Sequence, residues 1–195
     1  MIGTFISVGF RHIVSIEALD HLLFLAALAA SYRPRDWRHG LMVVSAFTVG
    51  HSITLALVAL NVVRFPIPVV EFLIPCTIVI AAAENLFDHG NRPAGALRPV
   101  LAGLFGLVHG AGFATTLRDL FDGGVALPLL GFNLGIELGQ ALVLTTLVGG
   151  LALADKALTA ATNRDPMTAT QWRMRLTSAT VASVALVLAA QRIPW

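Results

Sequence analysis

The sequence predicts an all-α, polytopic membrane protein, and three properties of the chain predict it. Hydrophobic residues make up 56% of the 195 residues, and the mean hydropathy is +0.80. Charged residues make up only 12%, whereas soluble domains carry roughly 25%. The apolar residues gather in long stretches, and about 20 such residues span a bilayer as a helix. This balance excludes a soluble globular domain and also a disordered chain.

Clusters of charge, proline and glycine divide the chain into six apolar stretches, each predicted to be a transmembrane helix. The six stretches are residues 15–32, 39–62, 67–87, 98–117, 126–153 and 174–192, within a single transmembrane domain over 1–195. Residues 1–14 lack the basic start of a secretory signal, and their apolar side chains share one helical face, which predicts an N-terminal interfacial helix. The longest connector, 154–173, is predicted to be a polar, partly helical surface segment and the best place for disorder.

The basic residues predict the orientation of the chain. Nine of the 13 Lys and Arg residues fall in the first, third and fifth connectors, and four fall on the opposite side. The positive-inside rule then predicts that both termini face away from the cytoplasm. The net charge of +2 is too small for a nucleic-acid-binding surface.

The predicted spans contain ionisable and amide side chains where polarity is costly. An ionisable residue at the bilayer centre costs about 2.5–3.5 kcal/mol, so each one needs a partner, a hydrated cavity or a function. The candidates are Glu17, Asp20, His21, His51, Glu84, His109, Asn133 and Glu137. Imidazole with oxygen donors suits nickel, cobalt or zinc, and the lone Cys76 and peripheral methionines disfavour a copper(I) path. The sequence therefore predicts a divalent-metal path.

Two stripes of small residues predict which spans pack closely. The stripes are Gly106, Gly110 and Ala114 in the fourth span and Gly131, Gly135 and Gly139 in the fifth. Because small residues let helix backbones approach, we expect these two spans to pack on each other, with His109 and Glu137 near a shared interior.

Residue counts along the predicted spans, at about 1.5 Å per residue, predict a graded path. Asp20 and His21 should lie in the outer half of the membrane, and His51, His109 and Glu137 near its middle. Glu84 should lie toward the cytoplasmic end.

Five motifs, in the same order along the chain, resemble those of the HupE/UreJ family of nickel and cobalt permeases. They cover residues 12–13 with 20–25, 47–55, 84–85, 106–114 and 132–140. The resemblance implies a multi-pass protein of the bacterial inner membrane that takes up nickel or cobalt, often for hydrogenase or urease. It assigns the metal to His12, Asp20, His21, His51, Glu84, His109 and Glu137. The first motif departs from the family at Ala18, where glycine is usual, and the adjacent Glu17 is an added candidate ligand.

The leading hypothesis is a permease for divalent transition-metal ions, with nickel, cobalt or zinc as cargo, no resident cofactor and no enzymatic activity. One alternative is an intramembrane zinc-dependent hydrolase, whose histidines would converge at about 2.0–2.1 Å from one zinc ion. Another is a metal-binding accessory subunit without flux. The expected partners are the lipid bilayer and the metal ion, but no nucleic acid. A homo-oligomer and metalloenzyme-maturation partners are both compatible with the sequence.

Overall fold

A computed structural model of the chain describes residues 2–87, 97–118, 124–162 and 165–194, without the side chains of 114–118 and 162. Within these ranges the chain is all-α, as predicted, and contains no strand. The helices are α1 (Ile2–Val14), η1 (Ile16–Ala18), α2 (Leu19–Ser31), η2 (Pro34–Asp36), α3 (Trp37–Ala59), α4 (Ile67–Phe87), α5 (Leu97–Arg118), α6 (Ala126–Thr162) and α7 (Pro166–Gln191). Most of the predicted connectors over 88–97 and 118–125, and residues 163–164, lie outside the described residues.

Four helices, α3, α4, α6 and α7, are long and apolar enough to cross a membrane. The segment that begins the chain passes the same test only as a bent pair, in which α1 meets Ile16–Ser31 at 59°. The part of α5 whose side chains are described, Leu97–Phe113, is also apolar. The predicted first span therefore corresponds to η1 and α2, and the predicted interfacial segment to α1.

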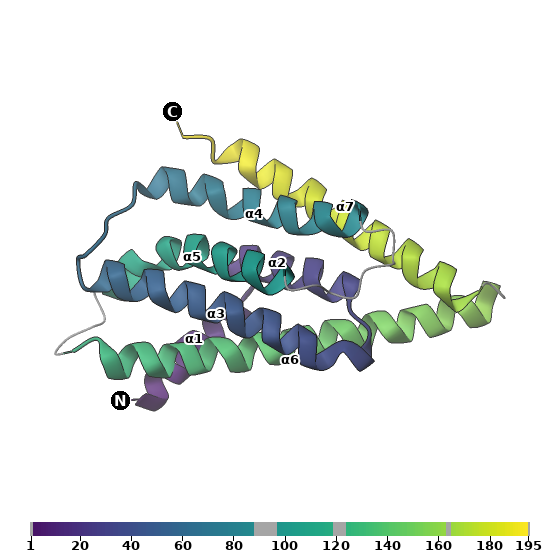
Figure 1. Cartoon of the computed structure of the whole chain (residues 1–195), viewed down its shortest axis with the longest axis horizontal. Coiled ribbons are helices and arrows are strands. Elements are labelled where there is room, and N and C mark those ends of the chain that lie inside the picture. Colours follow the sequence, from purple (N-terminus) through teal and green to yellow (C-terminus); the bar gives the residue numbers. More distant parts are fainter. Residues whose placement is uncertain (1, 88–96, 119–123, 163–164, 195) are drawn as a thin grey trace.

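The helices form an elongated bundle in which sequence-distant helices pair (Figure 1). α3 packs mainly along α5, α1 along α6, and α4 along α7. The short α2 contacts α4, α6 and α7, and most of its side chains are buried. α2 therefore places its polar residues inside the bundle.

The glycine stripes bring backbones together, but not those of the two helices that carry them. A Cβ atom on Gly106 of α5 would overlap the carbonyl oxygen of Phe47 in α3, and one on Gly135 of α6 would overlap that of Ile6 in α1. The prediction that the fourth and fifth spans pack on each other is therefore wrong. Small residues show that a close neighbour exists, but helix periodicity does not identify it.

Within the described residues, the predicted polar connector over 154–173 is helical except at Asp165. Asp165 begins α7 by accepting a hydrogen bond from the Thr168 backbone N–H at 3.2 Å, and Pro166 occupies the first turn. Asp155 of α6 pairs with Arg173 of α7 at 3.0 Å. Because these contacts hold the two helix ends together, α6 and α7 project as a pair beyond the other helices (Figure 1).

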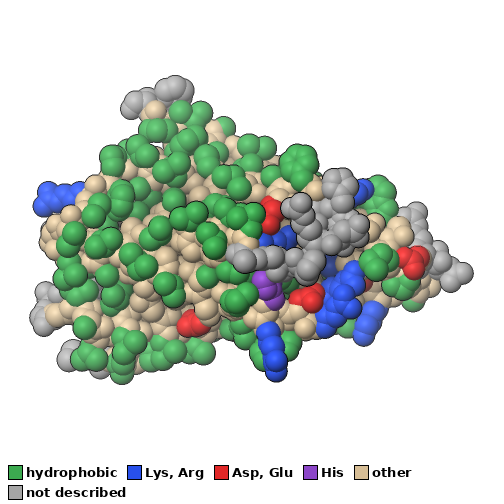
Figure 2. Space-filling model, viewed as in Figure 1, with side chains coloured by type: hydrophobic (Ala, Val, Ile, Leu, Met, Phe, Trp, Pro, Cys, Tyr) green, Lys and Arg blue, Asp and Glu red, His purple; other side chains and the backbone are tan. Residues whose placement is uncertain are grey.

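The surface is largely apolar over the bundle (Figure 2). In this view most of the Lys, Arg, Asp and Glu side chains gather toward the end where α6 and α7 project. An apolar body with charge concentrated at one end is the distribution expected for a protein embedded in a bilayer.

Candidate metal site

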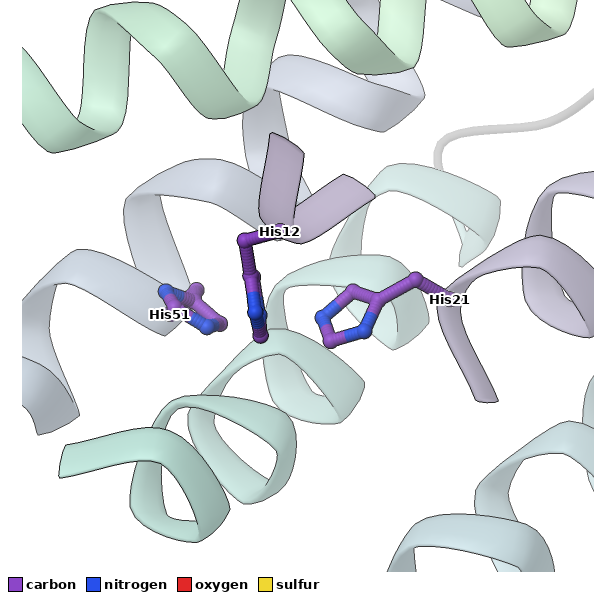
Figure 3. Close-up of side chains that lie close together, drawn as sticks. All are labelled: His12, His21 and His51. Atoms are coloured by element: carbon purple, nitrogen blue, oxygen red, sulfur yellow. The ribbon is translucent and has the colours of Figure 1, made fainter. Parts of the chain in front are cut away.

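Three histidines from three helices converge inside the bundle (Figure 3). His12 comes from α1, His21 from α2 and His51 from α3. One ring nitrogen from each lies within 4.8 Å of the other two. His21 and His51 are buried, and His12 is half-buried. We call these three residues the histidine triad.

The break between α1 and α2 is what brings His12 to His21. Along an uninterrupted helix these residues, nine positions apart, would be separated by about 13.5 Å. Ser15 leaves the helical conformation, with φ −71° and ψ 143°, and its hydroxyl accepts a hydrogen bond from the Glu17 N–H. The chain then bends by 59°. The ring centroids of His12 and His21 are consequently 4.7 Å apart.

The triad presents nitrogen atoms that no protein group uses. His12 Nε2, His21 Nε2 and both ring nitrogens of His51 are buried without a hydrogen-bond partner. Leaving a buried polar group unpaired costs about 1–3 kcal/mol. These nitrogens are therefore available to bind a ligand and do not stabilise the fold through hydrogen bonds.

The triad is close to the size that one ion requires. Donor atoms bound tetrahedrally to a single zinc ion at about 2.0–2.1 Å lie about 3.3–3.4 Å apart. The three nitrogens, which lie within 4.8 Å of one another, therefore need to approach by up to about 1.4 Å to share an ion. Imidazole donors suit borderline transition metals such as nickel and zinc better than magnesium.

His109 of α5 lies beside the triad and is held by Thr77 of α4. Its ring centroid is 5.2 Å from that of His21, and its Nε2 is 3.0 Å from the Thr77 hydroxyl oxygen. That hydroxyl donates its only hydrogen to the Ile74 carbonyl oxygen at 2.7 Å, so it accepts from His109 Nε2–H. The proton then sits on Nε2, and the unpartnered Nδ1 carries a lone pair.

Aromatic rings surround the histidines. Phe113 and Phe132 stack on each other at 5.3 Å and approach His12 at 4.0 and 5.7 Å. Phe47 lies 5.9 Å from His21 and 5.1 Å from His109. These rings exclude water and lower the local dielectric, which strengthens metal–imidazole interactions.

A cleft of about 600 Å³ reaches the triad at the α1–α2 break. His12 lines it together with Ser15, Glu17, Arg11 and Phe113. Irregular backbone at membrane depth is tolerated where it lines a cavity, as Ser15 does here. The cleft connects the half-buried His12 with exposed Glu17, the predicted additional ligand.

The other predicted acidic residues are paired away from the triad. Asp20 accepts a hydrogen bond from Arg192 at 3.0 Å, Glu84 from Arg98 at 3.1 Å, and Glu137 from the Ser45 hydroxyl. Glu137 is exposed on α6 and does not share an interior with His109. Asn133 has a buried Oδ1 atom without a partner, but it is not part of the triad. Among the described residues, no carboxylate joins the three donor atoms.

The histidines occupy one level of the bundle rather than the predicted successive depths. His21 lies 6.0 Å from His51 and 5.2 Å from His109, measured between ring centroids. The difference arises because the Ser15 break shifts α2 along the bundle relative to a straight span. Thr77 was not predicted, because an isolated hydroxyl in an apolar span gives no signal in the sequence. Arg98 was predicted to be one of the basic residues of the third connector, but its side chain is buried.

Comparison with known proteins identifies the family of the chain. A family profile described as HupE / UreJ protein matches residues 1–192 of the chain. No curated protein and no solved structure is significantly similar to it.

Proposed function

The chain belongs to the HupE/UreJ family, and from this premise we propose that it is a permease for divalent transition-metal ions, with nickel or cobalt as the principal cargo. Its long apolar helices and its family make it a multi-pass membrane protein. The observation that supports the proposal is the convergence of unpartnered nitrogens of His12, His21 and His51 at the inner end of an open cleft.

The proposed route begins at the cleft beside Glu17, whose carboxylate attracts a hydrated cation. The ion then exchanges water for the three imidazoles. A conducting site must bind well enough to replace hydration and weakly enough to release the ion. A site of three imidazoles without a carboxylate ligand meets both conditions. Broken helices that line a substrate site are also typical of transporters.

The proposed location is the bacterial inner membrane, with both termini outside the cytoplasm. The distribution of nine basic residues on one side against four on the other supports this orientation. Asp20, Glu84, His109, Asn133 and Glu137 remain proposed contacts for the ion elsewhere on its route.

An intramembrane zinc hydrolase is the second candidate, because it requires the compact histidine cluster that is observed. It also requires a carboxylate as general base beside the metal-bound water. Among the described residues no carboxylate joins the three donor nitrogens, and Glu84 and Glu137 are bound to Arg98 and Ser45, which favours transport.

Transport is tested by metal flux into proteoliposomes that contain the purified chain and a metal-sensitive fluorophore. We expect nickel or cobalt to enter, and His21→Ala to reduce the rate to that of protein-free vesicles. His39→Ala is the matched control, since His39 lies outside the triad, and should keep the wild-type rate. Metal binding without flux would identify an accessory subunit, and flux unaffected by His21→Ala would refute the proposed site.

The Thr77–His109 contact gives a second prediction. Thr77→Val removes the acceptor that fixes the His109 tautomer, and loss of such a supporting hydrogen bond typically weakens metal binding about 10–100-fold. Thr77→Ser keeps the hydroxyl and should bind nickel like the wild type. Equal nickel affinities of the two variants, measured by equilibrium titration in detergent, would exclude His109 from the site.

A further inference from the structure

A second polar cluster lies in the same helices, beyond a layer of phenylalanines. Along α5, Arg98, Ala102, Phe105 and His109 share one face, and Arg98 and His109 are about 16 Å apart along the axis. α2 carries the same kinds of side chain in the reverse order along its sequence, with His21 first, then Phe24 and then Ser31. The bundle therefore has three consecutive levels: imidazoles, aromatic rings and an arginine cluster.

The middle level is formed by Phe24, Phe47 and Phe105. Phe24 stacks on Phe47 at 4.7 Å and meets Phe105 edge-to-face at 6.3 Å. Phe24 and Phe47 also contact the ring of His109, at 6.0 and 5.1 Å. An apolar constriction of this kind opposes the passage of a hydrated ion.

The third level is centred on Arg98, whose side chain is 9% exposed. Its guanidinium donates to Glu84 at 3.1 Å, Asn85 Oδ1 at 3.2 Å and the Ser31 hydroxyl at 2.6 Å. Asn85 is fixed in turn by the Ala27 carbonyl oxygen at 2.7 Å and the Ser178 hydroxyl at 3.1 Å. Side-chain oxygen atoms of α2 and α4 thus surround the guanidinium group of Arg98 on α5.

The space between the second and third levels is small. A cavity of about 10 Å³ lies there, lined by Phe24, Phe105, Glu84, Asn85 and Arg98 among others. A cavity needs roughly 10–15 Å³ to hold one water molecule. A hydrated divalent ion cannot fit without displacement of the arginine.

We propose that the positively charged Arg98 side chain closes the metal path at its Glu84 end. The transported ion must then displace the Arg98 guanidinium from Glu84 to leave the protein. The inference rests on the proposed transport function. A guanidinium placed on a cation route raises the electrostatic barrier for free cations. An ion that reaches Glu84 competes for the same carboxylate, so arrival of the cargo and release of the arginine are coupled.

The sharpest test replaces both members of the pair, because removal of one alone leaves a buried charge without compensation. Glu84→Gln with Arg98→Met removes the ionic closure and keeps the side-chain volumes similar. The matched control is Asp155→Asn with Arg173→Met, since Arg173 is equally buried, at 9% exposure, and pairs at 3.0 Å. The control pair joins α6 to α7, and Arg173 also donates to the Ala30 carbonyl oxygen of α2 at 3.2 Å, so it is tied into the bundle as Arg98 is.

We expect the Glu84/Arg98 double variant to raise the downhill flux of cobalt into proteoliposomes by about tenfold, equivalent to ~1.4 kcal/mol of barrier. The Asp155/Arg173 double variant should keep the wild-type rate. If the two double variants carry cobalt at the same rate while wild-type flux still depends on His21, the gate is refuted and the permease stands. If the wild-type protein carries no cobalt into the vesicles, the permease itself fails.

A labelling measurement keeps the inference testable should the double variant not fold. In a Cys76→Ser background, which has no other cysteine, Ala102→Cys places a thiol at the small cavity. Cobalt should accelerate its reaction with a water-soluble maleimide several-fold, because Arg98 moves away. Ala185→Cys, buried at 0% exposure on α7, should not respond. Labelling of Ala102→Cys that is independent of cobalt, while flux persists, would overturn the proposal.

Discussion

Leucine in place of His51 should remove high-affinity nickel and cobalt binding without unfolding the protein. His51 is one of the three residues of the histidine triad, and both its ring nitrogens are buried without a partner. Loss of a supporting residue alone costs a metal site about 10–100-fold. Loss of a ligand should therefore weaken binding by at least ~100-fold, or ~2.7 kcal/mol.

The same substitution should leave the metal-free protein as stable as the wild type or more stable. His51 lies fully buried against Phe47 and Phe132, with ring centroids 6.2 and 6.3 Å away. Replacing an unsatisfied polar side chain by an apolar one of similar volume removes a penalty of about 1 kcal/mol or more. Misfolding would lower both metal affinity and stability, whereas loss of a ligand lowers only the first.

The measurements are metal titration in detergent and thermal unfolding with and without nickel. Nickel should raise the Tm of the wild type, because a ligand that binds only the folded state stabilises it. It should not raise the Tm of His51→Leu, and His39→Ala should behave like the wild type. Unchanged nickel affinity in His51→Leu would show that the triad does not bind the metal.

Most of the helices and most of the candidate site histidines could be predicted from the sequence. Hydropathy and helix-breaking residues predicted most helices, because burial in lipid requires long apolar helices whatever their neighbours. Because burial of an ionisable side chain in lipid is costly, His21, His51 and His109 could be predicted to have a function. His12 entered only through the family resemblance, since its approach to His21 depends on the Ser15 break. A single serine in the sequence does not show whether the helix bends there or continues.

Pairing of distant residues was the part that the sequence did not predict. Arg98 counted as one of the basic residues of a cytoplasmic connector, but it lies in the first turn of α5 with Glu84 and Asn85 around it. Its depth depends on where α5 begins and on the side chains that two other helices present there. The glycine stripes have the same ambiguity, because they predict a close contact without the identity of the partner.

The close contact of α3 and α5 carries the second large prediction, which concerns Gly106. A Cβ atom there would overlap the Phe47 carbonyl oxygen and lie 2.9 Å from the Phe47 carbonyl carbon and 3.0 Å from the His51 backbone nitrogen. These are backbone atoms, so relief requires the helices to separate. Gly106→Ala should lower the free energy of unfolding by about 1–3 kcal/mol and, because His51 moves with its helix, weaken nickel binding as well.

Gly149 of α6 provides a control with the opposite expected sign. A Cβ atom there has no neighbouring atom within 4 Å, and alanine stabilises a helix interior by about 0.8–1.0 kcal/mol relative to glycine. Gly149→Ala should therefore raise the free energy of unfolding in detergent and leave nickel affinity unchanged. If Gly106→Ala instead matches Gly149→Ala in both measurements, the backbones of α3 and α5 do not approach as described. The position of His51 opposite His21 would then lose its structural basis, because that close approach holds it there.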